Sequence, residues 1–560
     1  MNRSMVKKAP LAAALSALFA LTAQAAEPPQ QIPNAGSILQ QNQPPKPPSA
    51  SPSGTGLTIE QSNGTTAPPS APFPVSEIQI SGNTQFDTAT LHALVADAEG
   101  KSLTLEQLED AAGRITAYYR EHGFPLARAV IPAQAVKNGV IRVMVIEARF
   151  GKIKLDNRSR TGDGLLSETL APLQSGQQIE QGALDHSLLM LQDIPGVTAN
   201  ATLMPGEAVG TSDLDVVTTT DQAVAGSVSA DNYGNRYTGL ARLGGALNVY
   251  DPLHHGDLLS INALTTGSDM NYGRLGYEFL LNGAGTRLGA SYSALHYTLG
   301  DTLSALDGHG TADVASLWAK QTFIRTPKLN LYGQIEYDHK QLKDDIDVTD
   351  VQTDRHLDEV TASLYGDWRD ATGVNSWSAA LTQGRVAFGN AGAQLADAAT
   401  ARTQGSFTKW VGAVNRVQGF GQNDSLYIAL SGQWSNTNLD ASEKMVAGGV
   451  YTVRAYDMGA LSGDSGVLGN IEWRHELGRI WGGQTQALVF FDSQHVTVNT
   501  TAWTTGPNGA TLSGAGVGLN WYGPANSAVK ASVAAPVGAT PELAGAKKSE
   551  RAWIELDLGF

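Results

Sequence analysis

From residue 221 onward, the sequence consists of segments of about ten residues in which apolar and polar side chains alternate. Loops rich in Gly, Asp and Asn separate these segments. In one segment, for example, Leu275, Tyr277 and Phe279 are in phase and polar residues or glycine lie between them. A period of two belongs to β-strands with two unlike faces, because successive side chains of a strand point to opposite sides. The pattern predicts a long run of strands in this part of the chain.

A soluble β-sandwich also alternates, so the alternation alone does not require a membrane. Two features favour a closed transmembrane β-barrel. The polar faces carry full charges of both signs, as a water-filled lumen allows. In addition, the last strand places these apolar residues on one face: Ala552, Ile554, Leu556, Leu558 and Phe560. We count about 16 strands in residues 224–560, an even number that suits a closed antiparallel barrel without exposed edges.

The N-terminal region has the pattern of a secretory signal peptide over residues 1–25. Arg3, Lys7 and Lys8 precede an apolar stretch at residues 9–21, and Ala23-Gln24-Ala25 provides a small-x-small cleavage site. No later apolar run reaches the roughly 18 residues of a transmembrane helix. We therefore expect an exported protein that lacks a membrane-spanning helix.

Residues 26–74 read as a linker, because half of the 24 prolines fall there among Ser, Gln, Gly and Thr. Residues 34–42 are the one stretch of this linker that could form a helix. A helix of this length is marginal unless other parts of the protein hold it. Disorder throughout the linker is the alternative interpretation.

Two units with the order β-α-α-β-β follow, at residues 75–148 and 149–220. In the first unit, Thr104 and Gln107 form a capping box at the start of a helix, and Gly123 marks its end. Tandem α/β domains of about 75 residues fit this length. A small sheet beside two helices leaves an edge that an extended peptide can join. A role as a spacer or as a scaffold near the peptidoglycan is the alternative.

Arg454 is the one charged residue of the stretch from Gly448 to Tyr456, where Val and Tyr side chains surround it. About forty residues later Asp492 shares a strand face with Phe490, so it is expected to point into the barrel lumen. A guanidinium and a carboxylate in the lumen would form a bidentate pair that fixes an inward-folded loop to the wall. A solvated Arg on a surface loop is the alternative.

The segments Val453-Arg454-Ala455-Tyr456 and Phe490-Phe491-Asp492 resemble the VRGY and F-x-D motifs of two-partner secretion transporters, the ShlB/FhaC/HecB type of haemolysin secretion/activation protein. Each motif is short, but their order and spacing in a chain of this organisation are specific. The sequence departs from the family pattern at one position, where Ala455 replaces Gly. If that position needs a positive φ angle, Ala455 is strained there.

The resemblance implies a mostly β fold, in which two periplasmic POTRA domains (75–148 and 149–220) precede an outer-membrane barrel (221–560). It implies that the helix near residues 34–42 plugs the pore and that Arg454 anchors the inward loop to Asp492, with Tyr456 packed beside it. Phe560 resembles the C-terminal signal of outer-membrane barrels. The implied partners are an unfolded haemolysin- or adhesin-like exoprotein bound through the POTRA domains, outer-membrane lipid, and the barrel-assembly machinery during biogenesis.

Three other functions remain open from the sequence. A barrel-assembly factor has the same superfamily fold but usually more than two POTRA repeats. A passive porin would lack POTRA domains and would not need the Arg454 loop. In the third, a surface-binding protein, the barrel is only an anchor.

No enzymatic activity, cofactor or metal is expected. There is no cysteine, which excludes disulfides and thiolate metal sites, and a net charge of −15 argues against nucleic-acid binding. The stretch Gly463-Asp464-Ser465-Gly466 imitates a serine-protease motif but is interpreted as the start of a strand. His254-His255 is interpreted as a solvated turn. The acidic residues 344–350 lack the glycine and terminal glutamate of a calcium loop and are expected to form an exposed outer loop.

Overall fold

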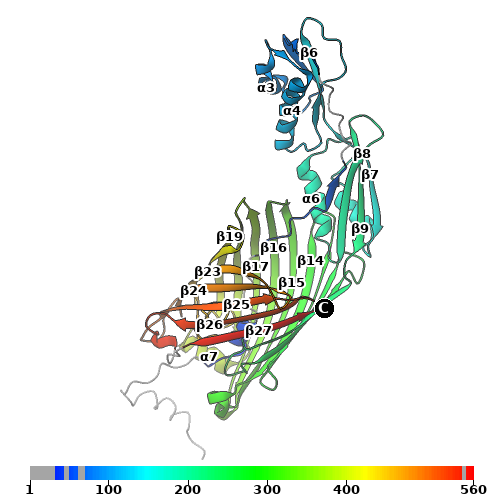
Figure 1. The fold of residues 1–560 in the computed structure, drawn as a ribbon. Coiled ribbons are helices and arrows are strands. Elements are labelled where there is room, and N and C mark those ends of the chain that lie inside the picture. The colour runs from blue at the N-terminus through cyan, green and yellow to red at the C-terminus, as the bar shows by residue number, and fades with distance from the viewer. Residues whose placement is uncertain (1–31, 43–48, 61–69, 545–549) are drawn as a thin grey trace, which may run out of the picture.

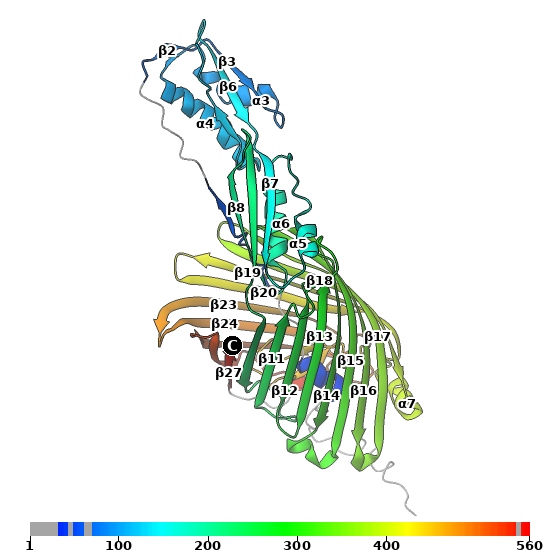
Figure 2. The same cartoon turned by 90° about the vertical axis from the view of Figure 1, so that its right-hand side faces the viewer.

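The structure is a computed structural model that describes residues 32–42, 49–60, 70–544 and 550–560. The predicted signal peptide at residues 1–25 lies outside the described residues. Figures 1 and 2 show two small α/β modules in line, the second of them seated at one end of a wide β-barrel.

Within the described residues, 16 antiparallel strands form the closed barrel, and its last strand pairs with its first. This confirms the predicted strand number and closure. The strands are β10 (Val224–Asp231), β11 (Arg242–Tyr250), β12 (Leu258–Thr265), β13 (Met270–Leu280), β14 (Arg287–Thr298), β15 (Gly308–Arg325), β16 (Leu329–Ile346), β17 (Val351–Arg369), β18 (Gly373–Phe388), β19 (Gly405–Phe420), β20 (Asp424–Ser435), β23 (Ser465–Ile480), β24 (Gly483–Thr497), β25 (Gly509–Tyr522), β26 (Ser527–Pro536) and β27 (Arg551–Gly559).

The alternation of the sequence divides the strands into an outer and an inner face. On β24, Val489 and Phe491 are 49% and 42% exposed, whereas Phe490 and Asp492 are buried. The outward positions of β27 likewise present Leu556 and other large apolar side chains. This apolar outer wall is the surface that a membrane barrel presents to lipid. Among the helices of the described residues, none is both long and apolar enough to span a membrane.

The first α/β module has the predicted element order. Its sheet has the order β3-β6-β5, and its helix α4 begins with the capping box of Thr104 and Gln107. Gly123 follows this helix with a φ of 90°, as expected for a C-terminal cap. The elements are β2 (Phe73–Pro74), β3 (Glu77–Ser81), α3 (Thr88–Ala93), η1 (Ala96–Ala98), β4 (Ser102–Leu103), α4 (Leu105–Glu121), β5 (Arg128–Val130) and β6 (Val140–Ile146).

The second module repeats this order and gains a strand from the linker. β1 (Leu57–Ile59) pairs in parallel with β8, so the sheet order is β1-β8-β9-β7. The pattern of the Pro-rich linker did not predict this strand, because three residues become a strand only when a sheet edge pairs with them. The other elements are β7 (Arg149–Arg158), α5 (Asp163–Leu170), α6 (Gln181–Gln192), β8 (Val197–Pro205) and β9 (Thr211–Thr220).

The second module is held on the barrel rim by a partly buried ion pair. Asp193, just after α6, accepts two hydrogen bonds from Arg325 at the end of β15, at 2.6 and 2.8 Å. Arg325 is fully buried. The oxygen of Asp251 also accepts a hydrogen bond from the Thr161 hydroxyl at 2.7 Å. A charge pair with this geometry specifies orientation, because neither partner can be left alone in a buried site.

Candidate functional site: the barrel lumen

Residues 436–464, which connect β20 to β23, fold back into the lumen. They contain the short strands β21 (Met445–Ala447) and β22 (Leu461–Gly463), which pair with each other. Val453 and Ala455 are buried in one cluster with Leu488 and Phe490, two inner-face residues of β24. We call residues 448–457 the inward loop, because its side chains pack on the inside of the barrel wall.

Arg454 of the inward loop and Asp492 of β24 are in direct contact. The Nε and Nη2 atoms of Arg454 donate to the two Asp492 oxygens at 2.8 and 2.7 Å, and the Arg454 backbone N–H donates to the same carboxylate at 3.1 Å. Asp492 is fully buried and the side chain of Arg454 is 11% exposed. The paired N–H donors match the fork of the carboxylate, which gives the contact directionality as well as charge attraction.

Three further residues complete this site, and the sequence motif did not indicate them. Glu472 of β23 accepts a hydrogen bond from Arg454 Nη1 at 2.6 Å. Asn470 donates to Asp492 at 2.8 Å, and Trp553 donates from its indole N–H to the Arg454 carbonyl at 2.7 Å. The guanidinium also lies 3.4 Å from the centre of the Phe490 ring. Asn470 and Glu472 share a face two residues apart, a spacing that reveals their orientation but not their partner.

Ala455 is not strained. Its φ angle is not positive, and the residue is almost fully buried. Its Cβ lies against Gly514 of β25, where an added Cβ would come within 2.4 Å of it. The methyl group that replaces the family glycine therefore occupies space that Gly514 leaves open.

Tyr456 follows in the same loop and is also buried, beside the inner-face residues Leu512 and Ala534. The predicted barrel-wall residue Phe490 covers the guanidinium of Arg454. Phe560 lies just beyond β27, on the outward face, and its carbonyl pairs with Gly226 of β10. The structure thus brings the residues of the two motifs together and leaves Phe560 at the seam between the last and first strands.

A second element in the lumen is the helix α2 (Ala35–Asn42), visible in blue inside the barrel in Figure 2. Ile38 and Leu39 are almost fully buried against inner-wall residues such as Leu342 and Phe407. The helix lies against β14, β15 and β16 on one side. It also contacts Leu439, which precedes the inward loop.

Polar contacts at both ends of α2 fix its position. At the start, the backbone N–H of Ala35 donates to Asp344 at 2.6 Å. Further along, Gln40 donates to the carbonyl of Ser442, and Gln41 accepts from Asn235 at 2.8 Å. An anionic partner at a helix N-terminus satisfies a free backbone N–H and complements the helix dipole.

The role of Asp344 corrects the expectation that residues 344–350 form an exposed outer loop. Asp344 belongs to β16, points into the lumen and accepts from Arg355 at 2.6 Å, while Arg355 also pairs with Asp440. Only residues 347–350 are exposed. The acidic run resembles a loop because its charges interrupt the apolar alternation, but the buried guanidinium of Arg355 on the neighbouring strand β17 pairs with Asp344.

A second charge cluster lies next to α2. Glu443 accepts hydrogen bonds from Lys340 and Lys409, both at 2.5 Å, and Lys340 also contacts Glu359 at 2.6 Å. Glu443 is 1% exposed. Its loop is thereby tied to two wall strands, β16 and β19, and through Lys340 to Glu359 of β17. The lumen therefore holds its contents through buried ion pairs as well as apolar packing.

The motifs that imitate enzyme or metal sites have structural roles. Asp464 is fully buried and accepts from the backbone N–H groups of Leu439 and Thr500, and Ser465 begins β23 as expected. His254 and His255 lie in the turn between β11 and β12. In the residues that the structure describes, no cluster of three His, Cys, Asp or Glu side chains could hold a metal ion.

A closed 16-stranded barrel with an inward loop, an internal helix and an N-terminal α/β arm defines an outer-membrane protein transporter of the POTRA-containing class. Residues 210–521 match the family described as haemolysin secretion/activation protein ShlB/FhaC/HecB, and residues 73–148 match the POTRA domain of ShlB type. The first match covers more than half of the 560 residues. The chain belongs to this family of two-partner secretion transporters, which export a partner exoprotein and are not enzymes.

Individual relatives agree with this assignment. The chain is 26% identical over 480 residues to the heme/hemopexin transporter protein HuxB of Haemophilus influenzae strain 86-028NP, covering 83% of this chain and 84% of HuxB. It is 24% identical over 426 residues to the outer membrane transporter CdiB of Escherichia coli O6:K15:H31, covering 73% and 70%. The solved structure of CdiB from Escherichia coli superposes with a TM-score of 0.69 at 20% identity, over 91% of this chain and 94% of that one.

Proposed function

We propose that the protein binds an unfolded haemolysin- or adhesin-like exoprotein through its two N-terminal modules and passes it through the barrel lumen to the cell surface. The observation that carries the proposal is the position of α2, a helix of the same chain that packs inside the lumen against its inner wall. A barrel through which solutes only diffuse has no need for such an internal helix or for an N-terminal arm of two modules.

The two lumen elements differ in how they are held, which supports different roles. Arg454 ties the inward loop to two carboxylates on two strands of the wall. The helix α2 has only eight residues and is connected to the rest of the chain by a linker. A helix of this length has little stability of its own once it loses its contacts with the lumen wall. We therefore assign α2 as the removable plug and the inward loop as a fixed part of the wall.

Binding of the client to the modules would use strand addition. In the described part of the chain, the outer edges of β3, β5 and β7 pair with no further strand. Glu99 accepts from the N–H of Ile78 on β3, and residues 176–178 bond with the start of β7. The rest of each edge can present backbone donors and acceptors to an extended peptide. The fourth edge, that of β8, is already occupied by β1 from the linker, which shows that this sheet accepts an added strand.

The test is deletion of the gene in its native host, followed by comparison of the culture supernatant and the outer-membrane proteins with those of the parent strain. Loss of one large exported protein, with other barrels unchanged, is the expected result. A broad loss of outer-membrane barrels would instead indicate an assembly factor, and slower solute uptake without a protein change would indicate a porin. Because HuxB is named a heme/hemopexin transporter, the missing protein is also tested for binding to heme and hemopexin.

A further inference from the structure

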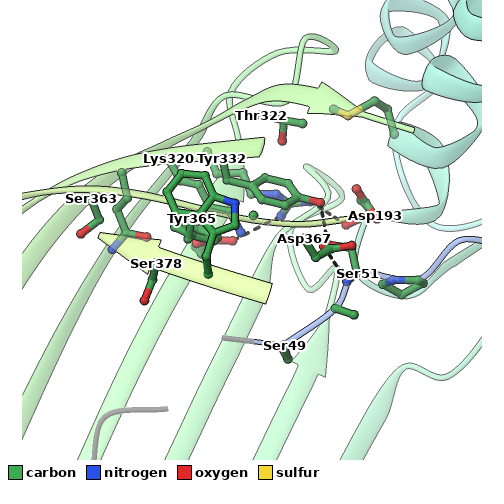
Figure 3. A pocket seen from close by; sticks show the side chains of 18 of the residues that line it. Ser49, Ser51, Asp193, Lys320, Thr322, Tyr332, Ser363, Tyr365, Asp367 and Ser378 are labelled. Carbon is green, nitrogen blue, oxygen red and sulfur yellow. Dashed lines mark hydrogen bonds and ion pairs between the residues drawn. The ribbon is translucent and has the colours of Figure 1, made fainter. Parts of the chain in front are cut away.

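Linker residues 49–52 belong to no helix or strand and lie at the mouth of the barrel nearest the second module (Figure 3). The backbone N–H of Ser51 donates to Asp367 at 2.9 Å. The backbone carbonyl of Ser51 accepts a hydrogen bond from Arg369, two residues further along β17. The Ser51 hydroxyl lies 3.0 Å from the hydroxyl of Tyr332 on β16. These three wall residues form what we call the mouth clamp.

The mouth clamp binds the main chain of Ser51 from both sides. The carboxylate of Asp367 accepts a hydrogen bond from the Ser51 N–H, and the guanidinium of Arg369 donates one to the Ser51 carbonyl. Because both contacts use backbone atoms, both would form with any residue except proline at this position. Only the contact with Tyr332 uses the side chain. Recognition of this kind depends on an extended backbone and a small residue and depends little on sequence.

Beside the linker lies a cavity of about 680 Å³. Figure 3 shows the stacked rings of Tyr332 and Tyr365 in its wall, with Lys320 close to them. The ammonium of Lys320 lies 5.3 and 5.7 Å from the two ring centres. The mouth clamp thus borders an open space that aromatic rings and hydroxyl groups line, large enough for several side chains of a second extended segment.

Hydrogen bonds connect the mouth clamp to the second module. Asp367 accepts from Asn330 at 3.0 Å, and Asn330 accepts from Arg325 at 3.1 Å. Arg325 in turn makes the bidentate pair with Asp193 of the second module. A polypeptide that passes from this module into the lumen therefore reaches the clamp at the point where the two parts of the protein join.

We propose that the mouth clamp is a binding site for the main chain of an extended client segment with a small side chain, and that Ser51 of the linker occupies it in the resting protein. The linker and the client then exclude each other at the clamp. This inference rests on the proposed export function and assigns to it a specific site, formed by Tyr332, Asp367 and Arg369. Arrival of the client would detach the linker on which the plug α2 hangs.

The test compares two ways of detaching the linker. Ser51→Pro removes the N–H that donates to Asp367 and the hydroxyl that contacts Tyr332, while the three clamp residues stay intact. A residue that precedes a proline, as Ser51 does, favours backbone angles that proline also adopts. Arg369→Gln replaces the guanidinium that donates to the Ser51 carbonyl with a shorter, uncharged amide and so damages the clamp itself. A nitroxide at Ala50→Cys, the single cysteine of the chain, reports by its mobility whether the linker has left. The amount of the large exported protein that gene deletion removes from the supernatant reports export.

Both variants are expected to increase nitroxide mobility. Ser51→Pro should export at least as much as the wild type, whereas Arg369→Gln should export roughly tenfold less, in line with the loss of one charge-assisted hydrogen bond. Tyr332→Phe should detach the linker partly, with a small loss of export. The matched control is Arg416→Gln on the same rim, because Arg416 pairs with Asp370 and not with the linker; it should resemble the wild type in both readouts.

If Arg369→Gln detaches the linker but exports like Ser51→Pro, the clamp holds only the linker and the inference is wrong. It is equally wrong if neither variant changes nitroxide mobility. If gene deletion removes no exported protein, the proposed function fails, while the nitroxide still reports on the clamp. Heat-modifiable migration of the folded barrel confirms for each variant that a loss of export does not come from failed assembly.

Discussion

The Cβ of Ala455 lies directly against Gly514. Between the inward loop and the barrel wall there is room here for one methyl group, which Ala455 provides. A Cβ added to Gly514 would come 2.4 Å from that of Ala455. Gly514→Ala is therefore expected to displace the inward loop and to reduce export several-fold by overpacking, which costs about 1–3 kcal/mol. Ala455→Gly in the same chain should restore export. If the double variant exports no better than Gly514→Ala, the collision is not the cause.

Removal of Arg454 is expected to harm export more than removal of Asp492. Arg454→Ala leaves the buried carboxylates of Asp492 and Glu472 without their shared cation, at a cost of about 3–5 kcal/mol. Asp492→Ala leaves Arg454 paired with Glu472 at 2.6 Å, so we expect a smaller loss. The double variant should be little worse than Arg454→Ala. Export and protease sensitivity of the loop measure the effect, and additive losses would show that the residues act independently.

Gly36→Ala is expected to open the pore. A Cβ at Gly36 would lie 2.6 Å from the backbone nitrogen of Ser442, in a loop that α2 must contact to remain seated. The substitution favours the helix itself by about 1 kcal/mol, so an increase in conductance would come from displacement and not from helix unfolding. Ion conductance in planar bilayers measures the open fraction.

The matched control is Gly113→Ala in the middle of α4, where an added Cβ meets no atom within 4 Å. It carries the same helix-favouring change without a collision and should leave conductance unchanged. Equal conductance of Gly36→Ala and the wild type would show that Ser442 moves to accommodate the methyl group.

The junction of the two modules is expected to loosen in acid because of Glu147. Burial raises the pKa of Glu147, but hydrogen bonds from Thr84, Gln85 and Tyr119 outweigh this and lower the pKa overall. Gln178 of the second module donates to the same carboxylate at 2.6 Å. The stabilisation that ionised Glu147 gives to the junction is fully present above the pKa of a glutamate in the unfolded chain, about 4.3. It is lost as the pH falls through the lowered pKa of Glu147 in the folded protein.

Nitroxide labels at one exposed position of each module measure this loosening as a distance distribution. The distribution should be narrow at pH 7 and broaden below about pH 4. In Glu147→Gln the distance distribution should be broad both at pH 7 and below about pH 4, because the neutral amide cannot accept all of these hydrogen bonds. A variant that keeps the narrow distribution at pH 7 would show that other contacts hold the junction.

The barrel and the orientation of its strands were predictable because alternate residues of a membrane barrel face lipid and lumen, and so alternate between apolar and polar side chains. The phase of Val489, Phe490 and Asp492 correctly indicates which side chains face outward and which face inward. The same phase places Glu472 on an inner face but cannot identify its partner. Contact between Glu472 and Arg454 depends on how β23 and β24 are aligned, and alignment between strands leaves no periodic signal in a single sequence.

The linker was the least predictable part. Its composition indicates an extended, solvated chain, and residues 49–52 belong to no helix or strand. Two of its attachments, β1 on β8 and Ser51 on the mouth clamp, use mainly backbone atoms. Almost every residue offers the same backbone donor and acceptor, so no pattern of side chains in the sequence predicts such contacts.

The sequence by itself determined the strand count, the two faces of the barrel wall, the order of elements in both modules and the two motifs that meet in the lumen. These properties depend on local periodicity and on residue type. Only the tertiary structure decided which charges share a buried site, that Asp344 caps α2, and that Ser51 lies in a clamp at the mouth. The contacts of Asp344 with Ala35 and of Ser51 with Asp367 join residues more than 300 positions apart, and the geometry of all these contacts exists only after the barrel has closed around them.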